Sequence, residues 1–166
     1  VDKVRAYAKS PVGTRERLDL KRVIEQCIGQ QRMIRRERMQ CVWHDLAEAE
    51  VMGDAVELGL VFTNLVKNAL EAVEGVERPG IAVTLAADEG WAVASVIDNG
   101  PALTEAAFEA LAMPFRTSKS QGLGLGLSIA KTIIESHGGS MRFSRNLPSG
   151  LAIDVRLPLA AGGEAA

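Results

Sequence analysis

Two spacings of apolar residues divide the chain into helical and strand-like stretches, the mixture expected of an α/β fold. The longest helix is predicted to begin after Asp54, a favourable N-cap, and to end before Gly75, with one broad apolar side. Further helical segments are expected over 1–10 (a helix end), 21–36, a short stretch capped by Thr104, and 125–137.

Strands are predicted where apolar and polar side chains alternate over short runs. Two of these runs flank Asp88-Glu89-Gly90, a turn sequence that predicts a β-hairpin. A second antiparallel pair is expected near the C-terminus. The predicted strands are 18–20, 39–46, 81–87, 91–97, 140–145 and 151–157.

Composition excludes some classes of function. Hydrophobic residues make up 47% and charged residues 24%, as in ordinary soluble globular domains, whereas aromatic residues reach only 4%, too few for base-stacking platforms. Residues 1–40 carry 11 Lys and Arg against 5 Asp and Glu, and the remainder carries 8 against 16. This acidic main part argues against nucleic acid as a partner. A basic cluster is either a solvated helix face or a docking patch: Arg32, Arg35, Arg36 and Arg38.

Cys27 and Cys41 form no CxxC pair, and no histidine pair has zinc-ligand spacing, so a reducing, cytoplasmic setting is expected. No apolar run approaches the roughly 18 residues of a membrane-spanning helix, and no signal peptide opens the chain. Because Val1 falls within a helical pattern, we expect a fragment of a longer protein, with its membrane anchorage left open.

The first motif with chemical meaning is NLVKNALEA in the long helix. Asn64, Asn68 and Glu71 share one face at this spacing. Asparagine is a weak helix former, so two of them one turn apart indicate a role. A neutral amide oxygen suits Mg²⁺ that already carries water and phosphate oxygens, and a polar face bonded to a neighbouring strand is the alternative.

The second motif, VIDNG, ends a strand with Asp98 before Gly100. Its carboxylate could accept a hydrogen bond from an exocyclic amino group, although Asp-Asn-Gly is also a common turn. In the third motif, GLGLGLSIAKTIIESHGG, glycines lead into a helix whose N-terminal amides suit phosphate. No strand precedes it, as a Rossmann motif requires, and no GK[ST] ending marks a phosphate loop.

In this order and with these separations, the three motifs resemble the catalytic and ATP-binding domain of two-component sensor histidine kinases. That domain belongs to an ATPase superfamily shared with gyrase, MutL and the heat-shock chaperones. NLVKNALEA is similar to the N box, VIDNG to the first glycine box, GLGLGLSIAKTIIESHGGSM to the second, and MPFRTSK to the segment before the nucleotide lid. The likeness covers about Leu18 to Pro158, and the NALEA form favours the nitrogen- or oxygen-sensing subgroup.

The resemblance implies a two-layer α/β sandwich of the Bergerat type, with a mixed sheet, three helices on one face and a short ATP lid. It divides the chain into the end of a dimerisation helix and linker (1–16), the ATP-binding domain (17–159) and a disordered tail (160–166). It implies that Asn68 coordinates Mg²⁺ and that Asp98 contacts the adenine amino group. Further residues implied at the nucleotide are Gly100, Thr117, Gly122, Leu123, Gly124, Leu125 and Gly126.

Lys67 and Lys119 are candidates for contacts with the phosphates, with a solvated surface charge as the alternative for each. Three alanines depart from the family pattern. Ala102 replaces a glycine of the first glycine box, Ala112 replaces a phenylalanine of the lid segment, and Ala152 falls where a threonine near the adenine is common. These departures predict weaker affinity, a stiffer lid and the loss of one water-mediated adenine contact.

Asn64 distinguishes transfer from hydrolysis, because the hydrolases of the superfamily place a glutamate there. An amide cannot accept a proton at neutral pH, so slow hydrolysis is predicted, with the γ-phosphoryl group kept for a histidine. His44 lies in a predicted strand without the phosphoacceptor context, and His137 lies at a helix end, where a cation would favour the dipole.

The expected partners are therefore ATP, a histidine-bearing dimerisation domain of the parent protein and a response regulator receiver domain. Two alternatives stay open: a regulatory nucleotide-binding module without turnover, and a serine kinase of the anti-sigma type. A housekeeping ATPase is disfavoured by Asn64.

Overall fold

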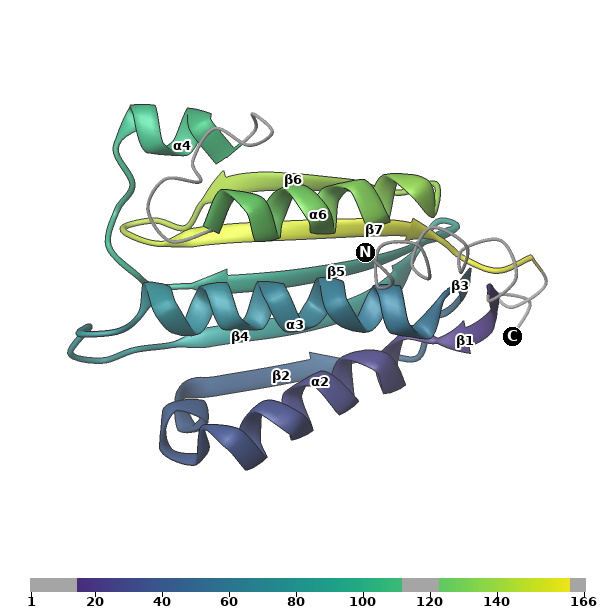
Figure 1. Ribbon diagram of the computed structural model, residues 1–166, viewed down its shortest axis with the longest axis horizontal. Helices are drawn as coiled ribbons and strands as arrows, with labels where there is room; N and C mark the ends of the chain where they lie inside the picture. Colours follow the sequence, from purple (N-terminus) through teal and green to yellow (C-terminus); the bar gives the residue numbers. More distant parts are fainter. Residues whose placement is uncertain (1–14, 112–122, 162–166) are drawn as a thin grey trace, which may run out of the picture.

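The structure, a computed structural model, describes residues 15–111 and 123–161 (Figure 1). The elements follow one another in chain order as β1 (Glu16–Asp19), α2 (Leu20–Ile34), the 3₁₀ helix η1 (Arg36–Cys41), β2 (Val42–Leu46), β3 (Glu50–Gly53), α3 (Ala55–Ala72), β4 (Ile81–Asp88), β5 (Trp91–Asp98), α4 (Glu105–Leu111), α6 (Leu123–Ser136), β6 (Ser140–Arg145) and β7 (Leu151–Pro158).

Five strands form one mixed sheet in the order β2-β4-β5-β7-β6. β2 runs parallel to β4, and the other neighbours are antiparallel. The predicted hairpin joins β4 and β5 through Glu89 (φ 48°) and Gly90 (φ 87°), the two positive φ values of a tight turn. β1 and β3 pair separately in a small antiparallel sheet.

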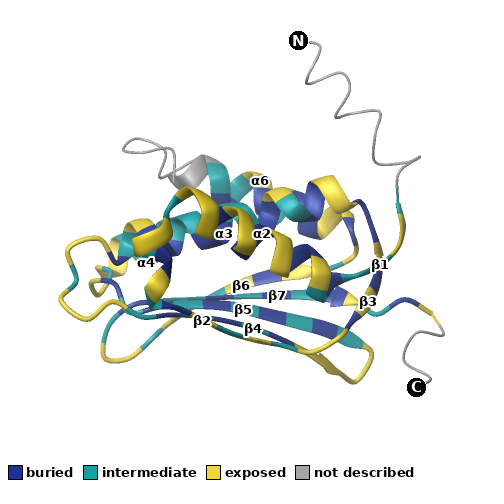
Figure 2. Ribbon diagram, turned by 90° about the horizontal axis from the view of Figure 1, so that it is seen from below, coloured by how far each residue is buried: buried dark blue, intermediate teal, exposed yellow. Residues whose placement is uncertain are grey.

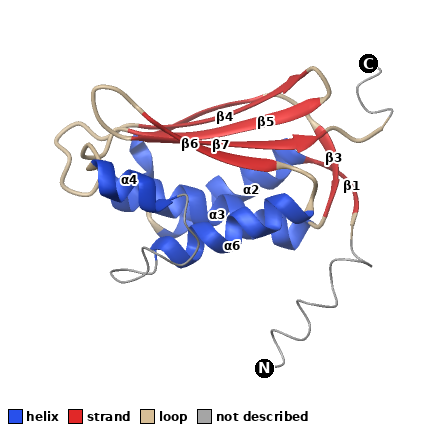
Figure 3. Ribbon diagram, turned by 90° about the horizontal axis from the view of Figure 1, so that it is seen from above, coloured by secondary structure: helices blue, strands red, loops and turns tan. Residues whose placement is uncertain are grey.

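Helices α2, α3 and α6 cover one face of the five-stranded sheet (Figure 3), so the predicted two-layer sandwich with three helices on one face is confirmed. Burial follows this arrangement, because strand residues alternate between buried and more exposed positions and the helices bury the sides that face the sheet (Figure 2). The core is aliphatic: Phe62 is its one fully buried aromatic side chain among the described residues. Scarce aromatics therefore did not prevent a packed core.

Several predicted boundaries were wrong. Residues 39–41, expected to begin a strand, belong to η1, and the strand starts at Val42. Strand β3 was not predicted, because its four residues lie between two stronger patterns. Helix α6 starts at Leu123, two residues before the predicted start at 125, so Gly124 lies inside its first turn instead of before it. The expected lid falls within 112–122, outside the described residues.

A buried polar cluster joins the start of α3 to the end of α6. The Asp54 carboxylate caps α3 by accepting the N–H groups of Val56 (2.9 Å) and Glu57 (3.1 Å), as predicted. His137 follows the end of α6. Its Nε2 accepts a hydrogen bond from the backbone N–H of Asp54 (3.1 Å), and its Nδ1 lies 2.9 Å from the carbonyl oxygen of Ile133. These partners require a neutral ring protonated at Nδ1. The role is structural, as expected, but the expected cation is replaced by a neutral imidazole.

Strand β5 and helix α3 end, and helix α6 begins, at the same end of the molecule (left in Figure 1). All three predicted motifs therefore reach this end, although they lie far apart in the sequence: 64–71 lies in α3, 96–100 spans the end of β5 and the turn after it, and 123–126 begins α6.

Candidate functional site

A cavity of about 90 Å³ lies where these elements meet. Its walls are apolar side chains of α3, α6, β5 and β7, and Asp98 and Asn68 are the polar groups on it. An enclosed apolar space with a few fixed polar groups suits a flat, mostly apolar ring. The lining residues are Leu65, Asn68, Ala69, Ala72, Val96, Asp98, Pro101, Leu103, Leu111, Leu127, Leu151 and Ile153.

Asp98 is fixed at this cavity and is only 6% exposed. Its Oδ1 accepts the N–H groups of Gly100 (2.8 Å) and Leu151 (3.3 Å). Burial raises the pKa of this carboxyl group, and those two backbone hydrogen bonds lower it in part. Since Oδ2 accepts no hydrogen bond from the described residues, the carboxylate has an oxygen left for a donor in the cavity.

Two glycines let the backbone close around Asp98. A Cβ on Gly100 would lie 2.6 Å from the carbonyl oxygen of Ala72, so only glycine lets the turn after β5 pass the end of α3. Gly150 has a φ of +116°, and a Cβ there would overlap the carbonyl oxygen of Asp98. The same carbonyl accepts the side-chain N–H of Asn146 (2.9 Å). Gly100 was predicted at the site; Gly150 and Asn146 were missed, although the turn-like sequence NLPSG marks them.

Asn68 lies in the last two turns of α3 and lines the cavity. Its Nδ2 is buried and has no hydrogen-bond partner among the described residues. A buried amide without a partner costs free energy unless a ligand satisfies it, so this side chain fits a ligand-binding role. No group of three or more His, Cys, Asp or Glu in the described ranges could hold a metal ion by itself. The amide oxygen of Asn68 would therefore have to share Mg²⁺ with phosphate oxygens and water.

A second, open hollow of about 710 Å³, which we call the vestibule, adjoins the cavity. The two share Asn68, Ala72, Pro101 and Leu103 in their walls. The vestibule is more polar than the cavity, so a ligand with an apolar ring and a charged tail could occupy both. Its lining residues are Arg35, Arg38, Asn68, Glu71, Ala72, Glu74, Pro101, Ala102 and Leu103.

The remaining predicted residues divide into three groups. Asn64 faces α6, where a Cβ added to Gly126 would lie 3.9 Å from its side-chain amide, and Lys67 lines neither hollow. Leu123 and Gly124 lie with Leu125 in the first turn of α6. Thr117, Lys119 and Gly122 lie outside the described residues, as does Ala112.

The alanine departures have different consequences. Ala102 lines the vestibule. Ala152 lies between Leu151 and Ile153, which both line the cavity, and it is not part of the cavity wall. Because successive side chains of a strand point to opposite faces, alanine at position 152 removes no contact from this cavity, contrary to the expectation from the sequence.

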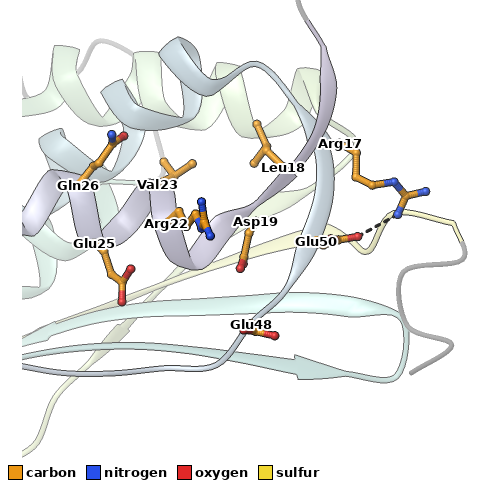
Figure 4. A pocket seen from close by; sticks show the side chains of 9 residues that line it. All are labelled: Arg17, Leu18, Asp19, Arg22, Val23, Glu25, Gln26, Glu48 and Glu50. Atoms are coloured by element: carbon orange, nitrogen blue, oxygen red, sulfur yellow. Dashed lines mark hydrogen bonds and ion pairs between the residues drawn. The ribbon is translucent and has the colours of Figure 1, made fainter.

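A larger groove of about 1060 Å³ lies near β1 at the opposite end of the molecule (Figure 4). Charged residues of both signs line most of it, and Arg17 and Glu50 form an exposed ion pair across 3.0 Å. It lacks the enclosed apolar wall and the buried, partly unpaired polar groups of the cavity. Size alone therefore does not identify the functional site.

Comparison with known proteins shows what this chain is similar to. Residues 53–161 match the family described as histidine kinase-, DNA gyrase B-, and HSP90-like ATPase. The C4-dicarboxylate transport sensor protein DctB of Rhizobium meliloti is 34% identical over 158 residues, which is 94% of this chain and 25% of that protein. The sensor protein FixL of Bradyrhizobium diazoefficiens is 38% identical over 112 residues, covering 66% of this chain and 22% of that protein. The chain thus spans about a quarter of the length of these relatives.

Solved structures give the same result. The catalytic domain of the histidine kinase ThkA is 29% identical with a TM-score of 0.75, and the match covers 87% of this chain and 95% of that domain. ThkA in complex with the response regulator protein TrrA matches with a TM-score of 0.75 at 25% identity, covering 96% of this chain and 46% of that one. Among the described residues, no helix combines the length and the apolar character needed to span a membrane.

Proposed function

This chain belongs to the family of histidine kinase-, DNA gyrase B-, and HSP90-like ATPases, as the ATP-binding catalytic domain of a sensor histidine kinase, and from that premise we propose how its site works. We propose that it binds Mg·ATP with the adenine in the cavity and the phosphates beyond Asn68, and transfers the γ-phosphoryl group to a histidine of the parent protein. The observation that carries this proposal is the buried Asp98 carboxylate, with one oxygen held by two backbone N–H groups and the other without a hydrogen bond from any of the described residues.

Asp98 supplies recognition of the base. The amino group of adenine is a donor that Oδ2 can accept, whereas guanine presents an acceptor at that position. The apolar walls, among them Val96, Leu127 and Ile153, add burial of the ring. Together these groups orient the nucleotide so that its phosphates lie toward the end of α3.

The end of α3 supplies the metal ligand. The buried, unpartnered amide of Asn68 fits a site for Mg²⁺, with its oxygen toward the ion and its NH₂ group available to a phosphate oxygen. When bound, Mg²⁺ would neutralise negative charge on the phosphate groups, which phosphoryl transfer generally requires. The protein contributes to catalysis by positioning the reacting groups and by electrostatic stabilisation, which account for most of the catalysis in this type of reaction.

Asn64 favours transfer over hydrolysis. It lies one turn before Asn68, beside Gly126 of α6, and its amide does not take a proton from water at neutral pH. The phosphoryl group therefore remains for a better nucleophile. We propose that this nucleophile is an imidazole on a dimerisation domain that precedes this one. The predicted boundary of that domain and its linker, 1–16, is one residue too long, because Glu16 already belongs to β1 and pairs with Gly53. A response regulator receiver domain would then take the phosphoryl group.

The test is phosphotransfer in trans with γ-labelled ATP, using the upstream dimerisation domain of the parent protein as acceptor. Acid-labile label on that domain, lost in Asn68→Asp, is expected. Acid-stable label would indicate a serine kinase instead. Tight Mg·ATP binding by calorimetry without any label would indicate a regulatory module.

A further inference from the structure

Two arginines in the wall of the vestibule come from outside the three motifs, and they share that wall with Glu71 and Glu74. Arg35 and Arg38 line it from the segment joining α2 to β2, well before the first motif in the chain. Of the two lysines predicted to contact phosphate, Lys67 lines neither hollow and Lys119 lies outside the described residues. The two arginines are therefore the cations that the described residues offer to a phosphate tail in the vestibule.

The two arginines are not equivalent. Arg38 is already engaged: its Nη2 donates to the carbonyl oxygen of Leu70 (3.3 Å) in the last turn of α3 and lies 3.1 Å from the Glu74 carboxylate. This places a cation at a helix C-terminus, where it satisfies an otherwise unpaired carbonyl group. Arg38 and Glu74 also neutralise each other's charge. The contacts of Arg38 therefore indicate a structural role and not a ligand-binding one.

Of the three guanidinium nitrogens of Arg35, only Nε has a hydrogen-bond partner among the described residues. Its Nε donates to Oε1 of Gln31 (2.8 Å), and Gln31 is itself only 5% exposed. The two terminal NH₂ groups make no hydrogen bond or ion pair with any residue in the described ranges. Arg32 and Arg36, from the same basic cluster, are exposed and do not line the vestibule. The four arginines of the basic cluster therefore lie in different environments, with Arg32 and Arg36 exposed and Arg35 and Arg38 at the vestibule.

We propose that Arg35 is a nucleotide-binding residue whose guanidinium contacts a phosphate group of ATP while the adenine occupies the cavity. The inference rests on the proposed function, since it takes ATP as the occupant. Asn68 lies in the walls of both the cavity and the vestibule, so a tail that leaves the cavity past Asn68 reaches the space that Arg35 lines. A guanidinium anchored at Nε keeps two NH₂ groups in a fixed plane, a geometry that matches two phosphate oxygens.

Calorimetric titration of the whole chain with ATP, ADP and adenosine, in the presence of Mg²⁺, tests this inference. In Arg35→Ala the dissociation constants for ATP and ADP should rise about tenfold, the effect of one half-exposed charge-assisted hydrogen bond, with adenosine binding unchanged. Arg36→Ala is the matched control, because it removes the same charge from the neighbouring exposed position. Arg35→Gln is a second variant of similar size, and thermal unfolding checks that each variant is folded.

Arg35 variants that bind ATP as tightly as the wild type would overturn the inference while leaving the proposed function intact. An equal loss of affinity for ATP and adenosine would also overturn it, because the effect would then come from a distorted cavity. If Arg36→Ala loses as much affinity for ATP as Arg35→Ala, the effect comes from long-range electrostatics. The proposed contact between Arg35 and a phosphate group would then be overturned. If the wild type binds neither nucleotide, the proposed function itself fails.

Discussion

Replacing Asp98 by asparagine should separate its structural role, accepting two backbone N–H groups, from its role in binding the adenine amino group. In Asp98→Asn the amide oxygen can occupy the place of Oδ1 and keep the bonds from the N–H groups of Gly100 (2.8 Å) and Leu151 (3.3 Å). The fold should therefore survive, with a change in unfolding free energy of about 1 kcal/mol or less. The amide NH₂ then takes the place of Oδ2, so a donor faces the adenine amino group, which is also a donor.

The expected loss of affinity follows from the bond that is removed. A hydrogen bond to a charged acceptor contributes about 1.5–3 kcal/mol, which corresponds to a rise of about 10- to 150-fold in the dissociation constant for ATP. Isothermal titration calorimetry measures this change. Chemical denaturation of the same sample measures the change in stability, and Asp98→Ala, which removes both sets of bonds, should lose stability as well.

The nucleobase can be changed in parallel. Inosine triphosphate carries a carbonyl oxygen where adenine has its amino group, so the preference for ATP over inosine triphosphate should shrink or reverse in Asp98→Asn. If Asp98→Asn binds ATP with unchanged affinity, or if its base preference stays that of the wild type, Asp98 does not read the amino group and the placement of adenine in the cavity is refuted.

Four further outcomes are expected. Burial, and then the charge of Asp54, raise the pKa of Glu57, so the folded state holds a proton that the unfolded state has lost; the unfolding free energy should fall as pH rises between the two pKa values, by up to about 1.4 kcal/mol per pH unit, and Glu57→Gln should abolish this slope in denaturation at several pH values. Gly150→Ala should lose at least about 2 kcal/mol of stability and also ATP binding, because of its φ of +116° and the overlap with Asp98. Gly59→Ala, in a helix with open space around it, should instead gain roughly 1 kcal/mol, and a loss there would contradict this view of the glycines. His137→Ala should cost at least about 2 kcal/mol by chemical denaturation, since it leaves the buried N–H of Asp54 without its acceptor.

The fold class could be predicted from the sequence alone, and its motifs supplied the candidate residues of the site. Helical and alternating spacings place α3, the β4–β5 hairpin and the last antiparallel pair within a few residues of their observed bounds. Asn68, Asp98 and Gly100 were predicted because amide, carboxylate and glycine at motif spacing carry local information. Local patterns were less reliable at boundaries, where 39–41 and Gly124 took conformations that the surrounding packing decided.

Only the tertiary structure decided which surfaces face the site. Strand alternation turns Ala152 away from the cavity, and backbone packing makes Gly150 indispensable beside Asp98. In the sequence, Arg35 cannot be distinguished from the other arginines of the basic cluster. In the fold, the end of α2 lies next to the end of α3, and this places Arg35 in the wall of the vestibule. The physical reason is common to all three: a motif records contacts between near neighbours in sequence, whereas orientation and long-range approach are set by how the whole core packs.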